Sequence, residues 1–336
     1  MRSVMALFLI LIPATAVVAR DVAPLTDPGK IFWAHAPFEM GECVICHESN
    51  DPQNPGGVSG EVNDLCFSCH DLFQATLSEF ANVHYPVEES CTNCHNPHNS
   101  SREKLLDLEP AALCGGCHEE ILARATGSPV KHDPVLEGRA CLNCHDAHAS
   151  RVEAMLTGLP YDLCVECHGR DGMTDESGRP LTNFRTLISG SHMEHGPVAD
   201  KDCSACHFTH GGSNFRMLVS EYPEKFYAPY DAANYDLCFS CHEIDVFESP
   251  ETTTLTGFRD GDRNLHHLHV NKIRRGRTCR ACHEVHAAPQ EHMIRDGVPY
   301  GPNNWILKIN FTGAPNGGSC AKTCHPTKPY DRTATP

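Results

Sequence analysis

The sequence is short of the aromatic residues that fill most globular cores. Phe, Trp and Tyr make up 7% of its 336 residues, and no segment beyond the N-terminus approaches the length of a transmembrane helix. Basic residues are also few, because the chain has 27 Lys and Arg against 43 Asp and Glu, which gives a formal charge of −16. The acidic balance excludes the basic surface of a nucleic-acid-binding protein. The shortage of aromatic bulk excludes an ordinary apolar core.

The N-terminus carries the one long apolar run. Arg2 precedes an apolar stretch from Val4 to Ile12, and small residues end at Ala19. This order predicts a cleaved signal peptide over residues 1–19, because the run is too short for a membrane anchor. We therefore expect an exported protein that is periplasmic, associated with the outer membrane, or extracellular.

Cysteine and histidine are abundant instead, with 20 Cys and 23 His. The cysteines form ten pairs, nine spaced C-x-x-C and the last C-x-x-x-C, and a histidine follows each pair directly. The pairs are Cys43 and Cys46, Cys66 and Cys69, Cys91 and Cys94, Cys114 and Cys117, Cys141 and Cys144, Cys164 and Cys167, Cys203 and Cys206, Cys238 and Cys241, Cys279 and Cys282, and Cys320 and Cys324. The motif histidines are His47, His70, His95, His118, His145, His168, His207, His242, His283 and His325.

Three chemistries use closely spaced cysteines: disulfides, structural zinc and covalent haem attachment. A disulfide framework places no demand on the residue after a cysteine. Zinc needs four Cys or His ligands, but not a histidine beside every second cysteine. C-x-x-C-H is the signature of c-type haem attachment, in which two thioethers hold the porphyrin and the histidine binds the iron. The sequence therefore predicts ten covalent haems c, with the motif histidines as proximal ligands.

Thirteen further histidines are available as second, distal iron ligands. Each odd-numbered motif has one seven to ten residues before its first cysteine: His35, His84, His132, His195 and His269. Four odd-numbered motifs read C-x-x-C-H-x-x-H, which adds His98, His148, His210 and His286. Side chains three residues apart on a helical turn lie side by side, so the second histidine of this octet must reach a neighbouring iron. As the tenth distal ligand we favour His266, with His192 in reserve.

The motifs alternate, because the even-numbered ones have leucine directly before the first cysteine in four of five cases. The chain is thus a repeat of five doublets, and repeated units of this length bury their faces against one another. We expect mostly coil with short α-helices and very little β-structure, built around a closely packed haem array. We divide the chain into residues 20–188, carrying haems one to six, and residues 189–336, carrying haems seven to ten.

These doublets resemble the multihaem c-type cytochromes with doubled CxxCH motifs. Residues 264–287 and 317–331 look like the C-terminal portion of such proteins in metal-reducing bacteria. The haem number and chain length are similar to those of periplasmic decahaem cytochromes that insert into outer-membrane porins, although the uneven later spacing and the C-x-x-x-C-H motif depart from that subgroup. The resemblance implies bis-histidine haems, low reduction potentials and electron exchange with extracellular acceptors.

A closed pair of axial ligands favours electron transfer over catalysis, since a haem enzyme needs an open coordination position. We expect redox proteins as partners: a porin with an extracellular cytochrome, or copies of the chain itself. One alternative is a subunit of an extracellular filament, in which His35 or a spare histidine binds a neighbour's iron. The other is a reductase with one open haem. The first haem is the suspect, because Asn50 replaces the octet histidine there.

Overall fold

The computed structural model describes residues 22–175, 178–301, 305–320 and 324–335. The predicted signal peptide, residues 1–19, lies outside these ranges. The chain forms two compact units, one comprising Met1–Cys117 and His145–Thr157, the other His118–Cys144 and Gly158–Pro336. The division at residue 188 stays a prediction. In the part of the chain that is described, no helix is both long and apolar enough to cross a membrane.

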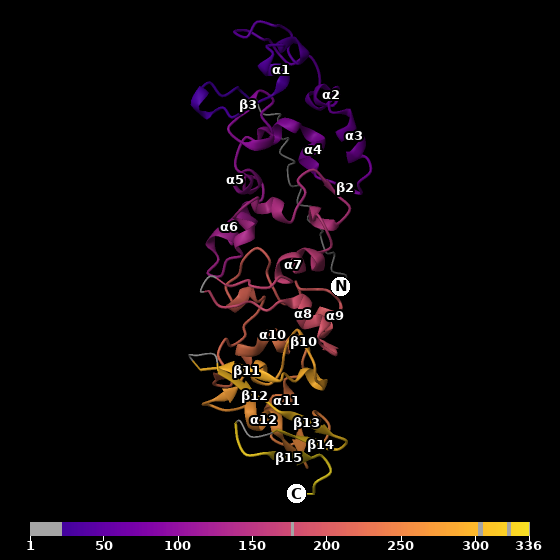
Figure 1. The fold of residues 1–336 in the computed structure, drawn as a ribbon, viewed down its shortest axis with the longest axis vertical. Helices are drawn as coiled ribbons and strands as arrows, with labels where there is room; N and C mark the ends of the chain where they lie inside the picture. The colour runs from indigo at the N-terminus through magenta and orange to yellow at the C-terminus, as the bar shows by residue number, and fades with distance from the viewer. Residues whose placement is uncertain (1–21, 176–177, 302–304, 321–323, 336) are drawn as a thin grey trace, which may run out of the picture. The chain divides into compact units, whose positions relative to one another are not determined.

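The first unit consists of short helices and two-residue strands joined by coil, in indigo to magenta in Figure 1. In chain order its elements are η1 (Pro28–Lys30), β1 (Trp33–Ala34), α1 (Ala36–Glu39), η2 (Cys43–Ile45), α2 (Val62–Phe67), α3 (Asp71–Leu77), β2 (Asn82–Val83), α4 (Tyr85–Glu89), η3 (Cys91–Asn93), β3 (Asn99–Ser100), η4 (Glu103–Leu105), α5 (Pro110–Gly115), β4 (Ala149–Ser150) and η7 (Glu153–Met155).

The second unit also begins with short helices and two-residue strands, and it has four-residue strands near its C-terminal end. Its helices are α6 (Glu119–Gly127), η5 (Asp133–Val135), η6 (Ala140–Asn143), α7 (Pro160–His168), α8 (Phe184–Ser189), α9 (Gly196–Ala199), η8 (Phe215–Met217), η9 (Ala232–Tyr235), α10 (Asp236–Phe239), α11 (Asp245–Glu248), α12 (Leu265–Val270), η10 (Cys279–Ala281) and η11 (Glu291–Met293). Its strands are β5 (Met193–Glu194), β6 (Tyr227–Ala228), β7 (Arg259–Asp260), β8 (Arg263–Asn264), β9 (Gly276–Arg277), β10 (Ala287–Ala288), β11 (Gly297–Tyr300), β12 (Trp305–Lys308), β13 (Phe311–Ala314), β14 (Gly317–Cys320) and β15 (Lys328–Asp331).

The two kinds of attachment motif fold differently. Four odd-numbered motifs form a single 3-10 turn, in η2, η3, η6 and η10. Four even-numbered motifs place their first cysteine within an α-helix, in α2, α5, α7 and α10. Proline at the first turn of α5 and α7 fixes the start of the helix without losing a hydrogen bond. The alternation that the sequence shows is therefore an alternation of local structure.

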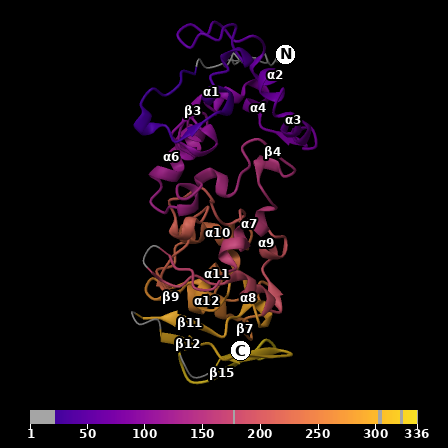
Figure 2. The ribbon, with the colours of Figure 1, turned by 45° about the horizontal axis from the view of Figure 1, so that its top comes forward.

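In the described ranges, strands longer than two residues begin at Gly297, after the ninth motif, and continue to Asp331. β11 and β12 form an antiparallel hairpin, and β14 lies between β13 and β15 in a three-stranded antiparallel sheet. Figure 2 shows these strands in yellow near the C-terminus, with α12 beside them. β15 and α12 both contact β7, so the sheet supports the helix that carries the H-H-L-H segment.

Buried apolar side chains are few in the part of the chain that is described, and many of them are alanines. The largest buried cluster consists of Leu218, Tyr222 and Tyr235, and it packs against the thiols of Cys238 and Cys279. Tyr235, from the aromatic insert of the fourth doublet, is fully buried. The expected fold class, mostly coil with short α-helices, is confirmed, and the β-structure consists of small sheets of two- to four-residue strands.

Candidate functional site

Seven motif histidines face a second histidine across a constant gap. In each pair the ring centroids lie 6.0–6.4 Å apart, and the ring planes are within 9–19° of parallel. The pairs, with the motif histidine first, are His47 and His98, His70 and His35, His95 and His148, His168 and His132, His207 and His286, His242 and His195, and His283 and His266.

This spacing fits one metal ion between two imidazoles. Two rings bound through Nε2 to the same ion, with bonds of about 2 Å, have centroids roughly 6 to 6.5 Å apart. Stacked imidazoles in direct contact would lie much closer. The gap is therefore wide enough for a haem iron with its porphyrin plane between the rings, and the flanking cysteine pairs are the donors that attach haem c covalently.

The pairs follow two offsets along the chain. The histidine upstream of a doublet faces the motif histidine of the second motif in the same doublet, as His35 faces His70. The second histidine of an octet faces the motif histidine of the first motif in the preceding doublet, as His98 faces His47. The ninth motif has no doublet after it, and there His266 from α12 faces His283. His269, on the same helix, lies near enough to His325 for their charges to interact.

The upstream histidines are positioned by a recurring H-x-P sequence. His35, His84 and His195 each cap an α-helix, and His132 caps η5, with proline as the second residue of the helix every time. Their extended backbone then pairs with a following octet, because the N–H of His35 donates to the carbonyl of His98 at 2.8 Å. The same bond joins His84 to His148 at 2.8 Å and His195 to His286 at 3.0 Å.

The side chains of three upstream histidines are oriented by backbone carbonyls. Nδ1–H of His35, His84 and His132 donates to the residue before an octet histidine, at 2.8–2.9 Å. A carbonyl oxygen only accepts hydrogen bonds, so Nδ1 carries the proton. Nε2 is left unprotonated, which is the form that binds a metal ion.

A second set of hydrogen bonds to backbone carbonyls orients the motif histidines of the odd-numbered motifs. Nδ1–H of each donates to the carbonyl of the residue nine positions later, at 2.7–3.3 Å; the acceptors are Gly56, Lys104, Ala154, Arg216 and His292. Four of these acceptors are non-glycine residues with φ of 53–60°, a left-handed backbone that costs roughly 1–2 kcal/mol per residue. This loop was not predicted from the sequence, although two consecutive Leu, Met or Ile residues follow the acceptor in four of the five motifs.

Burial keeps several of these imidazoles uncharged. Burial and then the neighbouring His283 lower the pKa of His266 to about 4, and burial lowers the pKa of His269 to about 4. Burial followed by a facing histidine also lowers the pKa of His98 and His148. A neutral imidazole has its metal-binding lone pair free, so these side chains are available as ligands at neutral pH.

The cysteines of successive motifs approach each other in two ways. Between doublets, first cysteines are hydrogen-bonded to each other: Cys66 to Cys91, Cys164 to Cys203, and Cys238 to Cys279. Within doublets, the second cysteine of the first motif lies near the cysteines of the second motif, as Cys46 does to Cys66 and Cys69. The same holds for Cys94, Cys144, Cys206 and Cys282.

The spare histidines have other surroundings. The backbone N–H of His192 donates to the carbonyl of Ala288, and His192 forms no ring pair with a motif histidine in the described ranges. His267 lines a surface cavity beside Arg263, and the carbonyl of His292 accepts from His283. Asn50 accepts a hydrogen bond from the backbone of Val44, inside the first motif. Of the two candidates for the tenth distal ligand, His266 is the one that faces a motif histidine.

We predict that Gly276→Ala disrupts the last doublet. A Cβ at Gly276 would lie 2.4 Å from the carbonyl oxygen of Val270 and 2.7 Å from that of Ala228, and backbone atoms cannot yield as side chains do. Overpacking of this kind costs about 1–3 kcal/mol or more, and here it would displace α12 with His266 and His269. The expected result is a lower melting temperature and fewer than ten haems by mass spectrometry. Gly127→Ala is the control, since nothing lies within 4 Å of its Cβ.

Four segments of the chain match the family model described as "Doubled CXXCH motif": residues 35–75, 84–123, 132–173 and 195–246. Together they cover more than half of the 336 residues. Each begins at one of the upstream histidines, His35, His84, His132 or His195, and contains one doublet. The unit that the family model recognises is therefore the doublet together with its upstream histidine. No curated protein matches the chain.

Proposed function

Because the chain belongs to the multihaem c-type cytochromes with the doubled CXXCH motif, we propose that it carries electrons through ten covalently bound haems c, each iron held between two histidines. The observation that supports this most directly is the set of seven parallel histidine pairs at 6.0–6.4 Å. Haem supplies the one-electron chemistry of its iron, and the protein supplies ligands, attachment and spacing.

The pairs support a proposed distal ligand for most of the irons. His98, His35, His148, His132, His286, His195 and His266 serve the first, second, third, sixth, seventh, eighth and ninth irons, and His269 serves the tenth. By position in the repeat alone, His84 belongs to the fourth iron and His210 to the fifth. Two histidines on an iron exclude substrate from the metal, so the remaining chemistry is outer-sphere electron transfer.

The cysteine contacts support a single file of haems within each unit. Once haem is attached, each of these sulfurs is a thioether at a porphyrin edge, so contact between sulfurs brings neighbouring edges together. The contacts seen among the described residues connect motifs that follow one another in the chain, such as Cys66 with Cys91 and Cys206 with Cys238. Within each unit, these contacts support haems that follow the order of the sequence.

The histidine pairs also bear on the alternative functions. His98 faces His47, so Asn50 does not leave the first iron open, which disfavours a reductase. His35 faces His70, so it is not free for a neighbouring copy, which disfavours a filament held together by shared iron ligands. We therefore rank a periplasmic carrier or a link to an outer-membrane porin and an extracellular cytochrome first, and a filament subunit second.

The test is a haem count by pyridine haemochrome with optical and EPR spectra of the purified ferric protein. We expect ten haems per chain, all low-spin. A high-spin signal from about one haem in ten would mean an open iron, and the reductase interpretation would replace this one. A count well below ten would contradict the assignment of every motif to a haem.

A further inference from the structure

Two arginines of the second unit gather on one phenylalanine ring. The guanidinium carbon of Arg216 lies 5.3 Å and that of Arg280 lies 5.8 Å from the ring centroid of Phe215. Cation–π contact holds each guanidinium there, but it also brings two positive charges together. Partial burial and then the charge of Arg280 lower the pKa of Arg216, which shows that the two groups act on each other.

Among the described residues, no ion pair joins either arginine to a carboxylate. Nε of Arg280 is buried and has no hydrogen-bond partner in the part of the chain that is described. The carboxylates whose charges act on Arg216 are Asp175 and Glu224, and both are paired with Arg179, at 2.8 and 3.3 Å. A buried guanidinium donor without an acceptor is costly. The arrangement therefore calls for an acceptor that carries negative charge.

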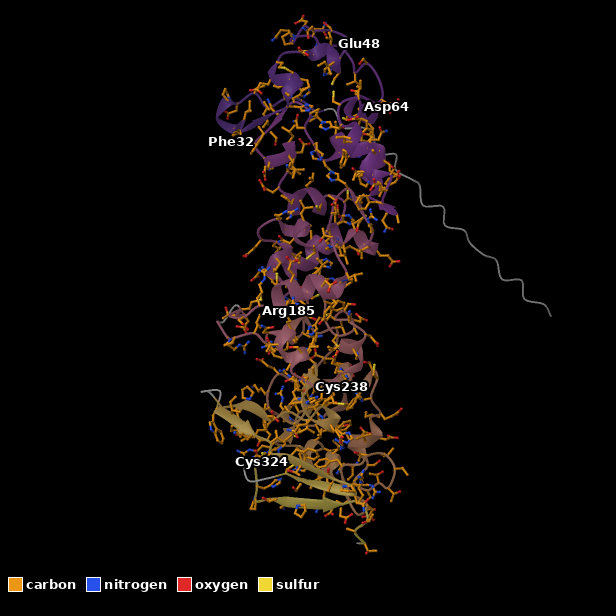
Figure 3. All side chains as sticks on the ribbon, turned by 45° about the vertical axis from the view of Figure 1, so that its right-hand side comes forward. Phe32, Glu48, Asp64, Arg185, Cys238 and Cys324 are labelled. Carbon is orange, nitrogen blue, oxygen red and sulfur yellow. The ribbon has the colours of Figure 1, made fainter. Side chains whose placement is uncertain are left out.

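The backbone around both arginines belongs to the haem attachment machinery. The carbonyl of Arg216 accepts from Nδ1–H of His207 at 3.0 Å, so its side chain starts beside the ligand of the seventh iron. Arg280 lies between Cys279 and Cys282, and its backbone N–H donates to the hydroxyl of Tyr222 at 2.8 Å. Cys238 lies among the packed side chains of the same unit, as Figure 3 shows, and contacts Cys279.

We propose that Arg216 and Arg280 together bind a propionate carboxylate of the seventh haem, the one carried by Cys203, Cys206 and His207. Each haem brings two carboxylates to a chain that already has a formal charge of −16, so these carboxylates need cations. Arg216 and Arg280 form no ion pair with a carboxylate of the described residues, and both are therefore available. Guanidinium groups bind carboxylates bidentately, and the unpaired Nε of Arg280 is the donor that such a contact uses. The proposal rests on the proposed function, since it needs a haem at the seventh motif.

Positive charge beside a haem stabilises the reduced form, so removing it lowers the reduction potential. In a spectroelectrochemical titration of the complete protein, R280Q is expected to shift one haem to lower potential. That haem accounts for about one tenth of the total absorbance change. A tenfold change in that haem's ratio of oxidised to reduced form corresponds to about 59 mV. R280K keeps the positive charge and is expected to keep most of the wild-type potential of that haem. R274Q is the control, because Arg274 is an exposed arginine of the same region.

A haem count and a low-spin EPR spectrum accompany each variant. If R280Q loses haem, R216Q provides the same test with an exposed side chain. Curves of R280Q or R216Q that coincide with the wild type, or an equal shift in R274Q, would overturn the proposal. So would a wild-type curve that moves with added phosphate while that of R280Q does not, since the bound anion would then come from solution. Failure of the proposed function would instead appear in the wild type, as missing or high-spin haems.

Discussion

His266→Ala is expected to turn one of the ten low-spin haems into a high-spin haem that binds carbon monoxide when reduced. The ring of His266 faces that of His283 at 6.3 Å and 19°, and alanine leaves that position of the iron without a side-chain ligand. Its ring is held by Nδ1, which lies 3.0 Å from the hydroxyl of Thr256, and by Phe247 and Phe258, whose rings meet it edge-on. In the described ranges, no other histidine ring faces that of His283.

The measurement is the ferric EPR spectrum together with the carbon monoxide difference spectrum of the reduced protein. His192→Ala is the matched control, because His192 precedes His195 by three residues just as His266 precedes His269. The control is expected to keep ten low-spin haems and to bind no carbon monoxide. High-spin haem in His192→Ala, or none in His266→Ala, would mean that the ninth iron is wrongly assigned to His266. Loss of an axial nitrogen ligand also raises the potential of that haem.

Much of the site could be predicted from the sequence, because covalent haem attachment depends on residues that are close in the chain. C-x-x-C-H places both sulfurs and one iron ligand within five residues, and no tertiary contact is needed to recognise it. The upstream and octet histidines were predicted in the same way, from recurring positions seven to ten residues before the first cysteine and three residues after the motif histidine. The fold class followed from the density of motifs, which leaves little chain for long elements.

Which histidine faces which motif could not be predicted, because the pairing depends on contacts between distant residues. His98 comes to face His47 because Trp33–Ala34 pairs with Asn99–Ser100, some 65 residues later along the chain. The H-x-P signal at His35, His84, His132 and His195 is visible in the sequence. It shows how each histidine begins its helix, but not which octet its backbone will join.

The strands of residues 297–331 form for a reason unrelated to haem attachment. The chain between Cys282 and Cys320 carries no attachment motif, so this insert has no haem of its own to pack against. Buried backbone groups need partners, and the hairpin of β11 and β12 and the sheet of β13–β15 provide them. Sequence spacing showed that the last doublet is long, but not that its extra residues form a β-sheet.

Removing the seventh haem with Cys203→Ala and Cys206→Ala is expected to interrupt electron flow between the sixth and eighth haems. In the second unit Cys203 contacts Cys164 of the sixth motif, and Cys206 lies near Cys238 and Cys241 of the eighth. Electron tunnelling decays exponentially with the distance between haem edges, so the gap left by one haem slows transfer by orders of magnitude. In film voltammetry at increasing scan rates, the haems before and after the gap should separate into a fast and a slow population.

The control removes a haem from the end of the file, with Cys320→Ala and Cys324→Ala. This variant also carries nine haems, but the loss at the end leaves no gap between the remaining haems, so its voltammogram should stay that of one connected population with a smaller charge. A haem count of nine and unchanged low-spin spectra are required of both variants. If the two behave alike, electrons bypass the seventh haem, and the haems of the second unit form a branched network. If only the internal deletion divides the signal, the order of motifs in the sequence is the order in which electrons travel.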